Sequence, residues 1–429
     1  MKSTLAVAAP IVAFAAAALL GGCQKVESPA SHTEASGDTV TEWRVPAAAG
    51  AAEPDLYLAP DGRLLLSWVK PFDKSRYVLQ FTTFDRNGHW QWAPKTIAVG
   101  ASMVINWADT PHIAATADGA LWAHWLQKTR GAEGEGHSYD VIVSRSGDDG
   151  MIWSAPVRAH DDGKPVEHGF VSFWPAARDR IGIAWLDGRN TIAGAGAAGH
   201  DGHGAGMMSL RAATIDAASR VQDSVEVDAS VCDCCGTDVA MTARGPLLVY
   251  RDRTADEIRD IYITRFDGGT WRTPAAVHAD GWKIAACPVN GPAVAATGEQ
   301  AVVAWFTAAN DTPLLQIARS QDAGDSFAAP VVVDKGEVVQ GRADVALDAK
   351  HAWVAWLRED GKGQSLWLAR YAPDLSRELA RIEIAKLQGR GRGTGFPKLA
   401  VRDGEAFLLW TDTVNGVPQL HGARIKAAG

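Results

Sequence analysis

The chain has 429 residues, of which 47% are hydrophobic, and it contains 17 Trp, enough apolar material for a large core. Charged residues make up only 21%, and the formal net charge is −8. This balance argues against a nucleic-acid partner, because a phosphate-binding surface is basic. The mild acidity identifies no other partner.

Residues 1–23 form a segment separate from the predicted fold. Lys2 is followed by the apolar run LAVAAPIVAFAAAALL, which is too short and too rich in alanine to predict a membrane span. The run ends in LGGC at positions 20–23, which resembles the lipobox of bacterial lipoproteins. The resemblance implies a signal peptide over residues 1–22 and lipid attachment to the thiol of Cys23. The alternative is an ordinary secretory signal with an incidental cysteine.

The residues after Cys23 bear on the destination of the protein. Gln24 stands where inner-membrane retention signals usually carry Asp, so we expect an outer-membrane lipoprotein that faces the periplasm. The cell surface is the alternative location, and in both cases the lipid at Cys23 makes the membrane a partner. Residues 23–39 are polar and lack an apolar pattern, which predicts a flexible tether. The folded part then spans residues 40–429.

One unit recurs through the folded part: a short strand, a tight turn, and a second strand that closes on an aromatic residue. In the first copy, PDLYLAPDGRLLLSW, apolar residues alternate with small or polar ones on both sides of a DG turn. The copies recur about every 57 residues. The closing aromatic residues are Trp68, Trp125, Trp185, Tyr250, Trp305, Trp356 and Trp410. Seven sheet-forming units at one long period predict an all-β fold, a seven-bladed β-propeller.

A complete blade has four strands, and the last blade is one strand short. Its third strand, QLHGARIKA (419–427), ends near the C-terminus, whereas TEWRVPA (41–47) is strand-like and precedes the first repeat. Pairing these two segments completes blade 7 and removes two open sheet edges. We therefore expect an N-terminal strand to close the ring, with a six-bladed ring as the alternative.

Two turns between third and fourth strands share the pattern S-x-D-x-G-x-x-aromatic, which resembles the Asp-box of sialidases and related propellers. We expect a structural role: Ser and Asp bond backbone groups of the turn, Gly permits a positive φ, and the aromatic ring packs between sheets. The residues are Ser146, Asp148, Gly150 and Trp153 in blade 2, and Ser320, Asp322, Gly324 and Phe327 in blade 5.

Residues 40–429 thus resemble the Asp-box (BNR-repeat), sialidase-like propellers. Sialidases themselves resemble six-bladed rings with an arginine triad, an acid–base Asp and a Tyr nucleophile paired with Glu. RVP (44–46) looks like their N-terminal motif, but the strand count places it on the outer closing strand, so no catalytic role is transferred. Tyr250 fills a packing position of the repeat, and Asp140 points to the opposite side of its strand from Tyr139. The catalytic residues therefore stay unknown.

Strand parity places the loops after each second strand, and the loops that enter the next blade, on one side of the ring, here named the long-loop face. Function often lies on such loops over a rigid scaffold. Guanidinium groups there suit binding of carboxylate, sulfate or phosphate. The alternative is that the charges pair with one another and hold blade junctions together. The candidate ligand-binding residues are Asp109, Glu167, His168, Asp187, Arg189, Asp238, Arg251, Asp252, Arg253, Lys283, Asn290 and Arg342.

Four cysteines remain besides Cys23. Cys232, Cys234 and Cys235 lie in the loop that enters blade 4, and Cys287 lies in the loop that enters blade 5, so we expect them to be neighbours. An even number in an oxidising compartment favours disulfides. We prefer the pairs Cys232–Cys235 and Cys234–Cys287, because a bond between the adjacent Cys234 and Cys235 would be strained.

A soft metal is the alternative interpretation of the cysteine cluster. Thiolates suit copper or zinc, and His200 or His203 on the neighbouring glycine-rich loop can complete such a site. A single reactive thiol is the third possibility.

Three functions follow from these observations. The first is a lipid-anchored periplasmic propeller whose long-loop face binds an anionic ligand, a glycan or a protein partner. The second is a glycoside hydrolase of the exo-sialidase type, which rests on the resemblance alone. The third is soft-metal binding by the cysteines. The choice among these three functions would be narrowed most by one observation: whether four carboxylates converge on one axial pocket. These are Asp109, Glu167, Asp187 and Asp252.

Overall fold

A computed structural model of the protein describes residues 37–91, 93–129, 138–191 and 206–428. The chain divides into two units, Met1–Ser31 and His32–Gly429, and every described residue belongs to the second unit. The predicted signal peptide, Cys23, nearly all of the predicted tether, His200 and His203 lie outside the described residues. Within these described ranges, no helix has the length and apolar composition that a membrane crossing requires.

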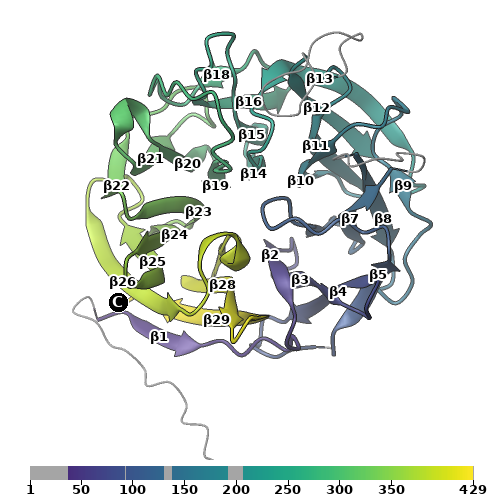
Figure 1. The fold of residues 1–429 in the computed structure, drawn as a ribbon, viewed down its shortest axis with the longest axis horizontal. Helices are drawn as coiled ribbons and strands as arrows, with labels where there is room; N and C mark the ends of the chain where they lie inside the picture. The colour runs from purple at the N-terminus through teal and green to yellow at the C-terminus, as the bar shows by residue number, and fades with distance from the viewer. Residues whose placement is uncertain (1–36, 92, 130–137, 192–205, 429) are drawn as a thin grey trace, which may run out of the picture. The chain divides into compact units, whose positions relative to one another are not determined.

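The described chain is all-β, and its strands form seven antiparallel sheets arranged as the blades of a propeller (Figure 1). Blades 1 to 3 are β2 (Ala52–Leu58), β3 (Leu64–Pro71), β4 (Tyr77–Phe84), β5 (Lys95–Gly100); β6 (Ile113–Ala115), β7 (Leu121–Lys128), β8 (Tyr139–Ser146), β9 (Val157–Arg158); and β10 (His168–Ala177), β11 (Arg180–Asp187), β12 (Met208–Ile215), β13 (Val221–Val231). The prediction of seven blades is confirmed.

Blades 4 to 6 follow the same order, from an inner strand outward. They are β14 (Asp238–Thr242), β15 (Gly245–Arg251), β16 (Ile261–Asp267) with the short β17 (Thr270–Trp271) and β18 (Ala275–Ala276); β19 (Ala293–Thr297), β20 (Gln300–Thr307), β21 (Leu314–Ser320), β22 (Val331–Lys335); and β23 (Val339–Leu347), β24 (Ala352–Asp360), β25 (Gly363–Tyr371), β26 (Glu378–Leu387). Two short 3-10 helices, η1 (Ala309–Asp311) and η2 (Gly391–Thr394), lie between strands.

Blade 7 joins the two ends of the described chain. It comprises β27 (Lys398–Arg402), β28 (Glu405–Val414), β29 (Val417–Lys426) and, as the outer strand, β1 (Thr39–Glu42). β1 pairs antiparallel with β29, from Thr39 opposite Lys426 to Glu42 opposite Ala423, so the predicted closure by an N-terminal strand is confirmed. The strand lies slightly earlier than predicted, because the chain leaves the sheet at Trp43, whose ring is buried among apolar side chains.

Packing between blades explains the repeated aromatic residue. All seven closing aromatics are buried, with exposed fractions of 8% or less. Each lies on the second strand of its blade and packs among buried aliphatic side chains, alanine and leucine or valine. Burial of large apolar surfaces is the main source of the stability of such a ring.

The two Asp-box-like turns form the hydrogen bonds that their sequence predicts. In blade 5, the Ser320 hydroxyl donates to Asp322 at 2.8 Å and accepts the Gly324 N–H at 2.8 Å, while Gly324 adopts φ 88°. In blade 2, the equivalent Gly150 N–H to Ser146 bond is 2.9 Å. The side chains of both Asp residues hold the turn rather than facing the long-loop face.

A second repeated device holds the inner strands together. A carboxylate near the inner strand of one blade accepts a backbone N–H from the inner strand of the next blade, 55 to 61 residues further along. The pairs are Asp55 with Ile113 (2.9 Å), Asp109 with Phe170 (2.8 Å), Asp238 with Val294 (2.8 Å) and Asp344 with Leu399 (2.7 Å). Through these hydrogen bonds the four Asp residues clasp adjacent blades, that is, they link the inner strand region of one blade to the next. For Asp109 and Asp238 this is the structural role that was the alternative to ligand binding.

Candidate functional site

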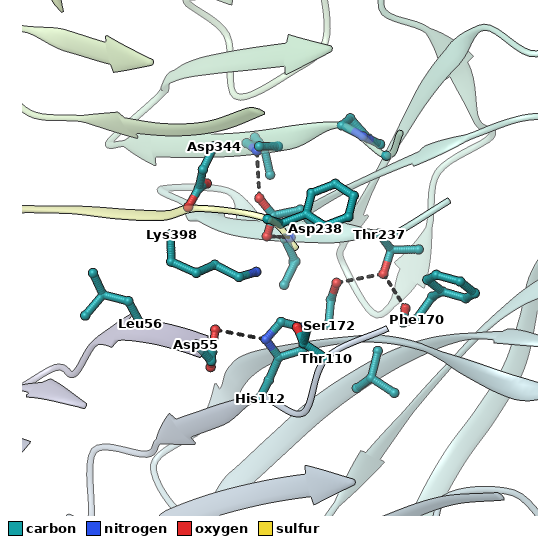
Figure 2. Close-up of a pocket in the computed structure, with 18 of the residues that line it drawn as sticks. Asp55, Leu56, Thr110, His112, Phe170, Ser172, Thr237, Asp238, Asp344 and Lys398 are labelled. Atoms are coloured by element: carbon teal, nitrogen blue, oxygen red, sulfur yellow. Dashed lines mark hydrogen bonds and ion pairs between the residues drawn. The ribbon is translucent and has the colours of Figure 1, made fainter. Parts of the chain in front are cut away.

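The inner strands of all seven blades surround a polar cavity of about 240 Å³, here named the axial cavity. Figure 2 shows its centre, where the Lys398 side chain from β27 extends between Asp55 and Asp238. Ser172 and Thr237 share a hydrogen bond of 2.7 Å on another part of the wall. The cavity therefore combines carboxylates, hydroxyls and one ammonium group.

The carboxylates of the axial cavity differ in their protonation. Burial of Asp55 disfavours its charged form. Its contact with the His112 ring at 3.0 Å, the charge of Lys398 and the hydrogen bond from the Ile113 N–H together have the larger, opposite effect and lower the pKa of Asp55 to about 2. Burial, together with the nearby charge of Asp344, raises the pKa of Asp238 to about 7. Burial likewise raises the pKa of Asp344. The cavity can thus both accept and donate hydrogen bonds at neutral pH.

A second pocket of about 190 Å³, here named the front pocket, lies on the long-loop face. It shares Ala108 and Phe170 with the lining of the axial cavity, so the two spaces are adjacent. Five loops that connect one blade to the next supply its wall. The polar and aromatic side chains that line it are Asn106, Trp107, Glu167, Phe170, Asp233, Cys234 and Arg392.

Beneath the front pocket, the hydroxyl of Tyr139 donates a short hydrogen bond to the carboxylate of Glu167. Burial and the charges of Glu167 and Asp109 raise the pKa of Tyr139 well above its usual value, so the phenol keeps its proton. Burial also raises the pKa of Asp109 well above the usual range. Tyr139 is only 4% exposed, which leaves Glu167 as the member of the pair that lines the pocket.

Glu53 belongs to the same acidic group. Its side chain is 6% exposed, and burial and the charge of Asp109 raise its pKa to about 8. One carboxyl oxygen of Glu53 and one of Asp109 are buried without a hydrogen-bond partner. Buried acids with unsatisfied oxygens and raised pKa values are typical of functional sites.

Three inner strands share a backbone irregularity next to the axial cavity. The inner strands β2, β10 and β23 each carry a bulge with a positive φ: 54° at Glu53, 54° at Phe170 and 49° at Arg342. In each strand the bulged residue lies two positions before a residue of the axial cavity wall. Such bulges re-aim side chains and are frequent beside functional sites.

Most of the arginines that were predicted to bind a ligand instead form hydrogen bonds or ion pairs within the protein. Arg251 is buried and donates to the carbonyls of Asn290, Arg259 and Phe306. Arg189 forms a two-point ion pair with Asp187. These contacts support the alternative that the predicted arginines stabilise the fold. A guanidinium N–H group that already donates to an acceptor inside the protein is not free to bind a ligand.

Arg253 and Arg342 are also held by neighbours. Arg253 bonds Asp233 at 2.8 Å and Glu257 at 2.6 Å. Arg342 donates to the carbonyl of Gly391 at 2.6 Å and lies over the Trp107 ring at 4.6 Å. Its pKa is lowered to about 10, chiefly by burial.

The remaining predicted residues are spread over separate places. Asn290 is buried and accepts the backbone N–H of Arg342, whereas Lys283 is exposed. Asp252 lines a different, outer pocket, where burial and the charge of Asp228 raise its pKa to about 7. Of the four carboxylates expected to converge on one axial pocket, Asp109 lines the axial cavity and Glu167 lines the adjacent front pocket. Asp187 and Asp252 line neither of these two spaces.

His168 and Asp187 belong to a buried group between blades 2 and 3. The rings of His160 and His168 stack at 3.6 Å, and the Nδ1 of His160 donates to the Asp162 carboxylate at 2.7 Å. Burial and the charge of His168 lower the pKa of His160 to about 4. His160, His168 and Asp140 place one ligand atom each within 4.8 Å of one another, an arrangement that can hold a metal ion.

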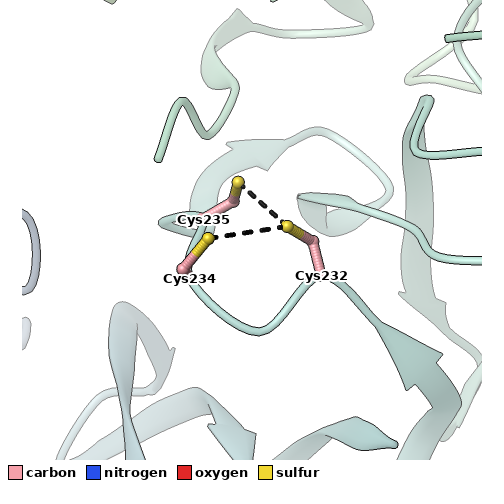
Figure 3. Close-up of side chains that lie close together, drawn as sticks. All are labelled: Cys232, Cys234 and Cys235. Carbon is pink, nitrogen blue, oxygen red and sulfur yellow. Dashed lines mark hydrogen bonds between the residues drawn. The ribbon is translucent and has the colours of Figure 1, made fainter. Parts of the chain in front are cut away.

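The four predicted cysteines come together, and three of them are shown in Figure 3. The Sγ atom of Cys232 lies 3.1 Å from that of Cys235 and 4.0 Å from that of Cys234. Cys287 reaches Cys234 from the next inter-blade loop, a contact that lowers the pKa of Cys287. All four are free thiols in the structure, and Cys232, Cys234 and Cys235 form a group that can hold a metal ion. The predicted disulfides stay a prediction.

Sequence reasoning missed several residues of the site. Glu53, Asp55 and Lys398 lie inside inner strands with an ordinary apolar pattern, and Arg392 lies in a glycine-rich loop. The spacing of the four Asp residues that link adjacent blades could have revealed them in the sequence. They recur at about the repeat interval or a multiple of it: Asp55, Asp109, Asp238 and Asp344.

No family model matches the sequence, and no curated protein matches it. Solved structures share the fold. The polysaccharide lyase Uly1 has a TM-score of 0.51 at 8% identity, over 90% of this chain and 91% of that chain. A protein of unknown function from Dyadobacter fermentans has a TM-score of 0.50 at 14% identity, over 91% and 99%. The NanB sialidase of Streptococcus pneumoniae has a TM-score of 0.47 at 10% identity, over 91% and 89%. At these identities the likeness to the first two structures shows the β-propeller fold alone.

Proposed function

We propose that this protein is an Asp-box, sialidase-like propeller that binds an anionic glycan in the front pocket. The observation that carries the proposal is that Arg392, Glu167 and Asn106, from three different inter-blade loops, line one pocket. A guanidinium group suits a sugar carboxylate or sulfate, while carboxylate and amide groups suit hydroxyls. A few polar groups that converge in a concave site are typical of ligand binding.

Calorimetric titration with neutral, carboxylated and sulfated oligosaccharides tests this proposal. We expect binding of an anionic glycan, and we expect Arg392→Ala to weaken it by about tenfold or more, the loss of one charge-assisted contact. Arg178→Ala is the matched control, because Arg178 is exposed in the turn between β10 and β11, on the opposite side of the ring. Equal affinity for neutral and anionic glycans, or equal loss in both variants, contradicts the proposal.

Hydrolysis of the bound glycan is a second candidate function, favoured by the hydrogen bond between Tyr139 and Glu167 beside Asp109. A carboxyl group whose pKa is raised by burial stays protonated at neutral pH and suits proton donation to a leaving group. The burial of Tyr139 ranks this function second, because a nucleophile must reach its substrate.

Release of a fluorophore from anionic glycosides distinguishes the two functions. Hydrolysis predicts that Asp109→Asn and Tyr139→Phe each lower turnover by about 100-fold or more. Binding of glycan without turnover by the unmodified protein removes the second candidate and leaves the first.

We further propose that the protein is an exported lipoprotein, anchored at Cys23 in the outer membrane and facing the periplasm. The lipobox-like LGGC at 20–23 supports this location. Labelling with a radioactive fatty acid, followed by membrane fractionation, tests it. Cys23→Ala should abolish the label and move the protein to the soluble fraction, whereas an unchanged distribution contradicts the lipid anchor.

A further inference from the structure

The cysteine cluster is built from two loops that the fold brings together. Cys232, Cys234 and Cys235 follow β13 and lead into blade 4, and Cys287 precedes β19 of blade 5. The backbone N–H of Cys232 is fixed by the carbonyl of Arg251 at 3.0 Å. The sulfur atoms of Cys232, Cys234 and Cys235 lie within 4.8 Å of one another. Cys287 is not part of this group of three, but its thiol is a hydrogen-bond neighbour of Cys234. A tetrahedral site with metal–sulfur bonds of about 2.3 Å needs sulfurs roughly this far apart.

Buried positive charge surrounds the sulfurs. The Arg259 guanidinium donates to the Cys232 sulfur at 3.4 Å, and Arg259 and Arg251 are both buried. A positive charge beside a sulfur atom favours its thiolate form. A thiolate is the form that binds metals.

Contacts with residues further from the sulfur atoms hold Arg251 and Arg259 in place. Glu257 accepts from Arg259 at 2.8 Å and from Arg253 at 2.6 Å, and Arg253 also bonds Asp233, which lies between Cys232 and Cys234. Arg251 is anchored by three backbone carbonyls. Such a shell holds ligands in position and commonly matters for affinity.

We propose that Cys232, Cys234, Cys235 and Cys287 bind one soft, thiophilic metal ion, Zn²⁺ or Cu⁺, through their sulfur atoms. Sulfur ligands select these ions over Mg²⁺ or Ca²⁺, which prefer oxygen. A Zn²⁺ ion with four thiolates carries two net negative charges, and so does Cu⁺ with three thiolates. Arg251 and Arg259 supply two positive charges beside the sulfurs, which compensates either complex in the interior. Each thiol that coordinates releases its proton to solvent.

The site is partly open to the long-loop face. Cys232 and Cys235 are buried, Cys234 is half-buried and lines the front pocket, and Cys287 is exposed. An ion can therefore enter from the front pocket side, with Cys234 and Cys287 as the outer ligands. This inference does not depend on glycan binding, and its test uses no glycan.

The experiment is metal analysis and thiol titration of the full-length protein, purified without oxygen. We expect one equivalent of Zn²⁺ or Cu⁺ per chain and four thiols, in the lipidated chain, that react only after a chelator is added. Titration of the chelated protein with Co²⁺ identifies a tetrahedral thiolate site by its sulfur-to-cobalt absorption bands, whereas luminescence on titration with Cu⁺ identifies a copper thiolate site.

Two variants make the test specific. Cys234→Ala removes a half-buried sulfur and should lower metal affinity by 100-fold or more, with an unchanged circular dichroism spectrum. Lys283→Ala, an exposed residue four positions before Cys287, is the control and should bind metal normally. Protein that contains two disulfides and no metal overturns the proposal, and so does full metal binding by Cys234→Ala.

Discussion

Tyr139 and Glu167 share a hydrogen bond although 28 residues separate them in the chain. Tyr139 begins β8 in blade 2, and Glu167 ends the loop that leads to blade 3, where the two backbones also form a parallel bridge. The pair therefore exists only when the two blades are packed together. Asp109, from the loop that enters blade 2, completes the group by clasping β10. This group, of which Glu167 lines the front pocket and Asp109 lines the axial cavity, is thus formed by the blade junction.

Gly169 is the residue that lets this group assemble. A Cβ atom at position 169 would lie 2.0 Å from Asp109 Oδ2 and 3.1 Å from the Tyr139 ring. We expect Gly169→Ala to displace Asp109 and weaken glycan binding by about tenfold or more, on the scale of one lost charge-assisted contact. Gly236→Ala is the matched control, because Gly236 lines the axial cavity with no atom within 4 Å of its Cβ position. Equal affinities of the two variants in calorimetry would contradict the assigned role.

The blades could be predicted from sequence because their signals are local. Alternation of period two, a DG turn and a buried aromatic residue lie within 15 or so residues of each other. The partner of Tyr139 was not predictable in this way: the sequence showed only that the neighbouring Asp140 points to the opposite side of the strand, whereas the partner, Glu167, comes from the loop that leads to the next blade. The same holds for Arg251, since a sequence does not reveal that a guanidinium is occupied by three carbonyls from blades 4 and 5.

The closure of the ring depends on a buried ion pair as well as on β1. Asp38 precedes β1 and forms two bonds with Arg370 of β25, at 2.5 and 3.0 Å, and accepts the Ala428 N–H. Asp38→Ala leaves a buried guanidinium without its carboxylate and should lower the free energy of unfolding by about 3–5 kcal/mol. Glu42→Ala breaks only an exposed pair with Arg44 and should change it by less than about 1 kcal/mol. Similar urea midpoints for the two variants would count against this account.

The Asp-box-like turns should matter for stability and not for binding. Asp322 accepts hydrogen bonds from Ser320 and from the backbone and hydroxyl of Ser326. We expect Asp322→Ala to lower the free energy of unfolding by about 1–3 kcal/mol, the cost of unsatisfied polar groups. Asp179→Ala, in the exposed turn between β10 and β11, serves as the control. A loss of glycan affinity in Asp322→Ala without a change in Tm would assign the turn a role in binding instead.

Stability should fall as the pH rises above neutrality, and Glu53 gives the reason. Its pKa is about 8 in the folded protein and near 4.5 when unperturbed, so the unfolded chain loses this proton at lower pH than the folded protein does. Stability from this group is therefore lost as the pH rises from about 4.5 to about 8.

His160 acts in the opposite direction at lower pH. Its pKa is about 4 in the folded protein, against an ordinary value of 6.5, so the unfolded chain takes up a proton first as the pH falls. Between pH 4.5 and 6.5 the two contributions oppose each other, and above pH 6.5 the loss due to Glu53 remains. Asp238 and Asp252, whose pKa values are raised to about 7, act in the same direction as Glu53.

Thermal unfolding followed from pH 5 to pH 9 measures this balance. We expect Tm to decline above pH 6.5, with Glu53 contributing on the order of 2 kcal/mol between pH 6.5 and 8. Glu53→Gln keeps the shape of the side chain but cannot ionise, so its Tm should decline less steeply over that range. Glu42→Gln, at an exposed position of β1, should reproduce the unmodified profile. If Glu53→Gln follows the same curve as the unmodified protein, the buried Glu53 carboxyl does not carry the raised pKa assigned to it.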